Sequence, residues 1–199
     1  LNIGGDATKA GDGFLEREGY VQAWSGWEGD ITTGLKIAPP VAVNPDGSPI
    51  TGRVRGEYIL GAASTTVNVT AAPAYAAASL DNADATLTRR VHQGDARETI
   101  PNSKWAFADC KAAPFPGKPD VGKVCLDGGF DTDHIYELVY TAKNPTVVGI
   151  GFAATRDFAA FLRGDVADVG PEAVNPVAGA IDNALIFGSS QSGRWVRTF

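Results

Sequence analysis

The sequence of 199 residues contains no methionine, only two cysteines and only two histidines, and it has no long apolar run. Without a stretch of about 20 apolar residues, no membrane-spanning helix is expected. The net charge of −6 and the lack of a basic run argue against a nucleic-acid partner. The two cysteines are too sparse for a zinc site, so we expect no metal. Because position 1 is leucine, we expect a processing site or the edge of a longer chain there.

The two cysteines, Cys110 and Cys125, lie in a segment rich in proline and glycine. A disulfide between them would close a loop of a size that stabilises a fold by about 3 kcal/mol. The alternative is a pair of free thiols. We favour the disulfide because this loop has little apolar core of its own. Such a bond needs an oxidising compartment, so we expect an exported protein, periplasmic or extracellular.

The apolar content of 44% is enough for a full core. The pattern of residues along the chain changes twice and divides it into three segments. Residues 1–30 contain a predicted strand at 20–24 and are typical of an α/β core. Residues 31–130 hold many prolines between short alternating runs at 53–60, 65–69 and 85–91, which predict the strands of a β-rich insertion with a half-exposed antiparallel sheet. Residues 131–199 again show a pattern typical of an α/β core, with a predicted strand at 135–140 and a predicted helix at 146–163.

The most informative motif is the hexapeptide GSSQSG at residues 188–193. It follows the apolar run at 184–187, which predicts a buried strand, and it precedes a segment from Arg194 that can begin a helix. A strand, a sharp turn that carries a serine and then a helix is the layout of a nucleophile elbow. The alternative is an ordinary turn in which a serine caps the helix.

The choice among the three serines depends on the size of their neighbours. A nucleophile in such a turn needs small residues two positions before and after it. Ser190 meets this condition with Gly188 and Ser192, whereas Ser192 itself would place the large Arg194 at one of these positions. We therefore predict Ser190 as the nucleophile and the backbone N–H of Gln191 as an oxyanion donor. The usual motif has glycine where this chain has Ser192.

Four runs resemble a group of bacterial α/β-hydrolase-domain proteins, many of which are exported. They are GYVQAWSGWEGD (19–30), IYELVYTAK (135–143), GIGFAATRD (149–157) and GSSQSGR (188–194). The resemblance implies the fold class α/β, with an α/β-hydrolase-type layered sheet that is partial in this chain, and a large β-rich insertion as a lid. It also implies a serine hydrolase that cleaves a small-molecule carboxylic ester through an acyl-enzyme on Ser190, without a cofactor.

The same resemblance implies that the chain is an internal piece of the molecule. The acid and the histidine of the triad would follow Phe199, and further polypeptide, from the same chain or a partner, would supply them. The isolated chain would then have little activity. The two histidines, His92 and His134, are expected at the surface; Asp131 and Asp133 beside His134 are interpreted as a turn and not as a metal site.

Trp27 lies on a loop after a predicted strand, where it would face a substrate; packing is the alternative interpretation. Two other functions stay open for the chain as a whole. It could be a non-catalytic binding protein on the same fold, or an acyltransferase that uses the same serine and passes the acyl group to an acceptor other than water.

Overall fold

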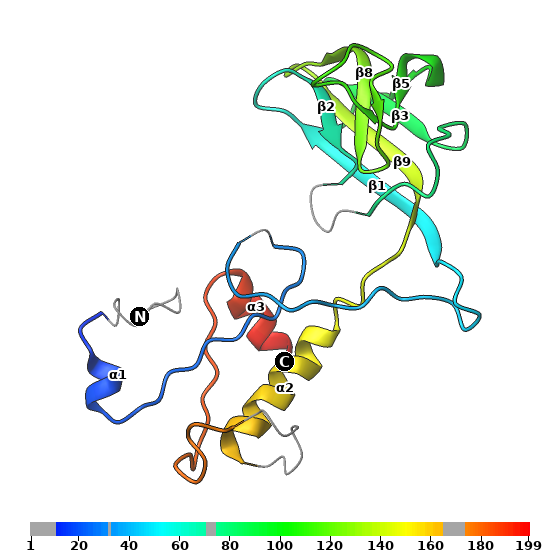
Figure 1. Cartoon of the computed structure of the whole chain (residues 1–199). Helices are drawn as coiled ribbons and strands as arrows, with labels where there is room; N and C mark the ends of the chain where they lie inside the picture. The colour runs from blue at the N-terminus through cyan, green and yellow to red at the C-terminus, as the bar shows by residue number, and fades with distance from the viewer. Residues whose placement is uncertain (1–10, 32, 71–74, 165–173) are drawn as a thin grey trace. The chain divides into compact units, whose positions relative to one another are not determined.

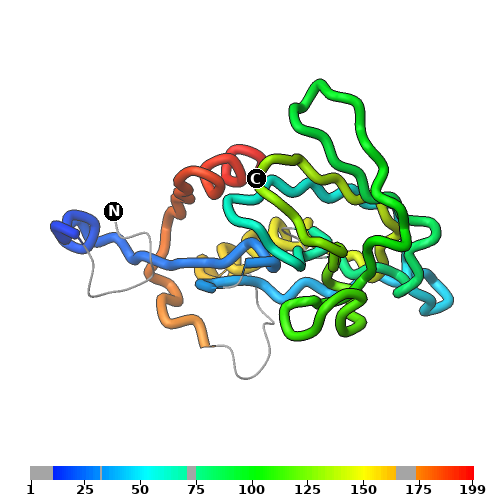
Figure 2. The backbone as a smooth tube through the Cα atoms, turned by 90° about the horizontal axis from the view of Figure 1, so that it is seen from above, coloured from blue at the N-terminus to red at the C-terminus, as the bar shows by residue number. Residues whose placement is uncertain are grey.

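The structure is a computed structural model that describes residues 11–31, 33–70, 75–164 and 174–199 (Figure 1). The chain divides into two compact units. The first consists of the two ends, Leu1–Pro39 and Val148–Phe199, and is called the terminal unit below. The second, Pro40–Val147, is called the β unit. The backbone of each unit can be followed by colour in Figure 2.

The β unit is built from antiparallel sheets. The larger sheet has four strands in the order β1-β9-β3-β4, namely Thr51–Ile59, Ile135–Lys143, Thr86–Arg90 and Glu98–Ile100. The second has three strands in the order β2-β8-β5, namely Ser64–Asn68, Lys123–Phe130 and Trp105–Ala106. A two-stranded sheet pairs β6 with β7, Ala108–Asp109 with Lys118–Pro119, and the 3-10 helix η2 covers Asn102–Lys104.

β9 lies between β1 and β3 in the larger sheet and buries one of its faces in the core. Tyr136, Leu138 and Tyr140 are almost fully buried, because alternate side chains of a strand point to the same face. Residues of the second sheet join them in one apolar cluster. In it the rings of Phe130 and Tyr136 meet edge to face, with their centroids 4.9 Å apart. Trp105 from β5 is also buried in this cluster, so the core of the β unit takes side chains from both sheets.

The opposite face of β9 carries a network of charged side chains centred on Glu137. This carboxylate is only 9% exposed and accepts hydrogen bonds from Nε of Arg55 at 2.7 Å and Nε of Arg97 at 3.0 Å. Arg90, which is 1% exposed, bonds to Glu57 at 2.8 Å and lies 3.5 Å from Glu137. The hydrogen bond from Arg97, with further help from Arg55 and against the effect of burial, lowers the pKa of Glu137 to about 2.

The two cysteines of the predicted disulfide, Cys110 and Cys125, lie at disulfide distance, with their Cα atoms 5.5 Å apart. Both residues are buried, and they pack with Ala108 in a small cluster beside the main core. Among the helices of the described ranges, none is both long and apolar enough to cross a bilayer.

In the part of the terminal unit that the structure describes there are three helices. They are α1, Phe14–Arg17, α2, Ile150–Arg163, and α3, Gln191–Thr198. Gly164 ends α2 with a φ of 80°, a left-handed conformation that glycine adopts without strain. The predicted helix at 146–163 begins later than expected, because Thr146 forms an antiparallel bridge with Val41 inside the β unit.

The predicted fold class is wrong. All strand pairs in the described part of the chain are antiparallel, whereas an α/β-hydrolase-type layered sheet is largely parallel. The expected strands at 20–24 and 184–187 belong to no described ladder, and Leu185 and Phe187 are 84% and 65% exposed. A continuous apolar run forms a parallel strand only if other strands and covering helices surround it, and the described residues do not supply them.

The strand at 135–143 also lies elsewhere than expected. The sequence pattern places it in the α/β core, but β9 pairs with β1 over its full length and with β3, so it belongs to the β unit. The β unit therefore spans Pro40–Val147, whereas the sequence placed the insertion at 31–130.

Candidate functional site in the turn before α3

Ser190 has an unusual backbone conformation. Its φ is 54° and its ψ is −116°, and Asn144 is the other non-glycine residue with positive φ in the described ranges. This conformation lies outside the regions that are allowed for ordinary L-residues, and holding a residue there costs about 1–3 kcal/mol. Ser190 is exposed, and its side chain makes no capping hydrogen bond with α3. The capping interpretation of the motif therefore finds no support in the geometry.

Two glycines allow the chain to turn this sharply. A Cβ atom on Gly188 would lie 2.3 Å from the carbonyl oxygen of Ser192 and 2.8 Å from the nitrogen of Gly193. A Cβ atom on Gly193 would lie 3.0 Å from the carbonyl oxygen of Gly188. The entering chain and the first turn of α3 therefore approach each other at these two residues, and the shift of the second glycine by one place still provides the close contact that the elbow interpretation requires.

Trp27 explains the presence of a serine at position 192. Its indole Nε1 donates a hydrogen bond to Oγ of Ser192 at 3.1 Å. Its ring stacks on that of Trp195, with the ring centroids 5.5 Å apart. The ring of Trp195 stacks in turn on that of Phe152, with centroids 5.0 Å apart. A Cβ atom on Gly151 of α2 would lie 2.2 Å from the carbonyl oxygen of Trp27. Trp27 thus packs against Trp195 and bonds to Ser192, and its predicted role in binding substrate stays a prediction.

Glu28 is a residue of this site that the sequence reasoning missed. Its Oε1 accepts a hydrogen bond from Nε2 of Gln191 at 3.1 Å. Desolvation, followed by the hydrogen bond with Asp30 and the charge of that residue, raises the pKa of Glu28, and the hydrogen bond from Gln191 opposes this rise. Nothing in the sequence marked the pair, because Glu28 and Gln191 are 163 residues apart.

Both histidines are in the β unit, and each is bonded to a nearby aspartate. Nδ1 of His134 lies 2.8 Å from the carboxylate of Asp131, and Nδ1 of His92 lies 3.1 Å from that of Asp95. His92 is 81% exposed at its side chain. Within the ranges that the structure describes, no group of three or more potential ligands is placed to hold a metal ion.

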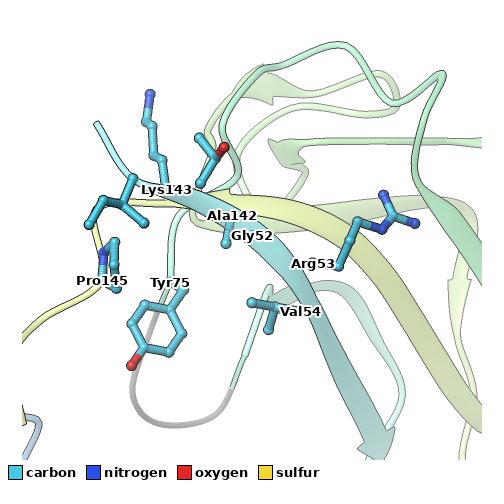
Figure 3. Close-up of a pocket in the computed structure, with 9 residues that line it drawn as sticks. Gly52, Arg53, Val54, Tyr75, Ala142, Lys143 and Pro145 are labelled. Atoms are coloured by element: carbon cyan, nitrogen blue, oxygen red, sulfur yellow. The ribbon is translucent and has the colours of Figure 1, made fainter. Parts of the chain in front are cut away.

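Two of the pockets in the described part of the chain lie in the β unit. The first, of about 130 Å³, has a largely apolar lining that includes Val54, Tyr75 and Ala142 (Figure 3). The second has a volume of about 370 Å³. Two ion pairs contribute to its lining, Arg89 with Glu98 and Lys104 with Asp127. The predicted site residues Ser190, Gln191 and Trp27 line neither of them.

Comparison of the chain with protein-family models, with curated proteins and with solved structures finds no match.

Proposed function

We propose that this protein is a serine hydrolase that cleaves a small-molecule carboxylic ester through an acyl-enzyme on Ser190. The observation that carries the proposal is the strained conformation of this exposed serine, with φ 54° and ψ −116° at the start of α3. Strained backbone clusters at functional sites, and a nucleophile elbow needs a serine in such a turn. The likeness to the α/β-hydrolase-domain group supports the chemistry of this turn and not the layered sheet.

The proposed reaction has two steps. Oγ of Ser190 attacks the ester carbonyl carbon while a base takes the hydroxyl proton, and the alcohol then leaves with that proton. The backbone N–H of Gln191 donates to the oxyanion that forms, because the first N–H groups of a helix have no partner within it. Water then attacks the acyl-enzyme and releases the acid. No cofactor takes part in this scheme.

The base and its acid partner are proposed to come from further polypeptide, from the same chain or a partner. A serine hydroxyl is a weak nucleophile until a base takes its proton. The chain contains only His92 and His134, and both precede Ser190, whereas in α/β-hydrolases the acid and the histidine follow the serine along the chain. We therefore expect His134→Ala to leave the reactivity of Ser190 unchanged, and a loss of reactivity would make Asp131 and His134 the acid and base.

We also propose that the protein works in an oxidising compartment, either the periplasm or the outside of the cell. The buried bond between Cys110 and Cys125 supports this location, because such bonds persist where thiols are not kept reduced.

The test is labelling with a fluorophosphonate, performed on the protein as its complete gene encodes it. We expect one label, on Ser190, and its loss in Ser190→Ala. Ser189→Ala is the matched control, because Ser189 is the exposed neighbour in the same turn and should be dispensable. Labelling that survives Ser190→Ala would refute the assignment, and a protein that takes no label would favour the binding-protein alternative. Product analysis in the presence of alcohols separates a hydrolase from an acyltransferase.

A further inference from the structure

The loop at residues 26–30 contacts the first turn of α3 through two hydrogen bonds. Trp27 donates to Oγ of Ser192 at 3.1 Å, and Gln191 donates to Oε1 of Glu28 at 3.1 Å. Two consecutive residues of the loop thus hold the two residues that follow Ser190. One bond is donated from the loop and the other from the helix.

The loop itself is closely packed, which makes Glu28 a well-placed acceptor. A Cβ atom on Gly26 would lie 2.4 Å from the backbone of Leu35, and one on Gly29 would lie 2.4 Å from the side chain of Pro39. The backbone N–H of Ile37 donates to the carbonyl oxygen of Glu28 at 3.1 Å. These contacts connect both ends of the loop to residues 35–39.

We infer that Glu28 is a positioning residue for the oxyanion donor: by holding the side chain of Gln191, it fixes the direction of the Gln191 backbone N–H beside Ser190. This inference rests on the proposed hydrolase function. The physical reason is the strain at Ser190, whose ψ of −116° sets the plane of the peptide bond that carries this N–H. A strained peptide relaxes by rotation unless its surroundings hold it, and an oxyanion donor that rotates away no longer stabilises the transition state.

Glu28→Ala removes the acceptor, and we expect the rate constant for phosphonylation of Ser190 by a fluorophosphonate, in which fluoride leaves, to fall by about tenfold. Complete removal of an oxyanion donor costs about 100- to 1000-fold, and a loosened donor should cost less. The binding constant of the fluorophosphonate should not change, because Glu28 touches Gln191 and not the reagent. Glu28→Gln should restore the rate to within about twofold, since its amide oxygen can accept the same hydrogen bond.

A double-mutant cycle tests whether the two residues act through each other. Gln191→Ala should lower the rate as much as Glu28→Ala, and the double variant should be no slower than either single one. Glu18→Ala is the control, since Glu18 is an exposed carboxylate elsewhere in the terminal unit. The melting temperature and circular dichroism of each variant separate a loss of fold from a loss of positioning, and the conservative Glu28→Gln variant should keep the fold.

The outcomes separate this inference from the proposed function. A wild-type protein labelled at Ser190, with Glu28→Ala equally fast, would overturn the positioning role and leave the hydrolase proposal standing. Additive effects of Glu28→Ala and Gln191→Ala, or no rescue by Glu28→Gln, would also overturn it. A wild-type protein that takes no label at Ser190 would overturn both. Three results together would support the inference: slower labelling of Ser190 in Glu28→Ala, a restored labelling rate in Glu28→Gln, and a double variant that is no slower than either single one.

Discussion

Replacement of Glu137 by glutamine tests the charged network of the β unit. The network lowers the pKa of this carboxyl group from 4.5 to about 2. At about 1.4 kcal/mol for each pKa unit, this shift corresponds to about 3 kcal/mol of interaction with the charged form. The side chains of Arg55 and Arg97 are 51% and 47% exposed, so solvent screens part of their interaction with Glu137. We therefore expect Glu137→Gln to lower the free energy of unfolding by about 2 kcal/mol.

The sign of the pH dependence follows from the direction of the shift. Because the folded-state pKa of Glu137 lies below its unfolded value of 4.5, its contribution is fully present above about pH 4.5. It is lost as the pH falls from 4.5 towards 2, where the carboxylate takes up a proton in the folded protein as well. The difference in stability between the wild type and Glu137→Gln should therefore disappear over this range.

Hydrogen exchange of the β9 amides, Ile135–Lys143, measures this loss locally, without the need for a single unfolding transition of both units. At pH 7 we expect these amides to exchange about 30-fold faster in Glu137→Gln than in the wild type. Glu98→Gln is the matched control: Glu98 pairs with Arg89 on the same sheet but is 64% exposed, so its loss should matter little. Equal effects of the two variants, or an NMR titration that gives Glu137 an ordinary pKa, would refute the reasoning.

Two further predictions concern the serine turn and the disulfide. Gly188→Ala should slow fluorophosphonate labelling by more than about tenfold, because its new Cβ would lie 2.3 Å from a carbonyl oxygen and widen the turn. Gly149→Ala, where no atom lies within 4 Å, should label normally, and normal labelling of both would contradict the steric argument. The double variant Cys110→Ser, Cys125→Ser should have a free energy of unfolding lower by about 3 kcal/mol, which is the expected effect of a cross-link between residues 15 apart. A thermal melt should then show the β unit unfolding about 10 °C or more below the wild type, and an unchanged melt would count against a stabilising bond.

The antiparallel strands show what the sequence could predict about the fold. The alternating runs at 53–60, 65–69 and 85–91 predict short strands, and the structure has β1, β2 and β3 there. The disulfide could also be predicted, because two cysteines allow a single pairing within the chain. The helix that follows the serine turn is found as α3.

The placement of strand 135–143 could not be predicted in the same way. Its pattern, with apolar residues such as Leu138 and Val139 side by side, fits a strand of either a parallel or an antiparallel sheet. Only the partners β1 and β3 decide between them, and they lie far away in the sequence. The exposed run at 184–187 illustrates the same point, since an apolar run says that a strand is possible but does not supply its neighbours.

The sequence by itself determined the local geometry of the candidate site. The small residues Gly188 and Ser192 on either side of Ser190 predict a tight turn because backbone sterics act over a few residues, and the structure has a tight turn there. Only the tertiary structure decided what holds it. Trp27 and Glu28 reach α3 across 165 and 163 residues, and contacts at such distances depend on how the whole unit packs. No local pattern encodes them, because each side chain could equally well have been solvated or paired elsewhere.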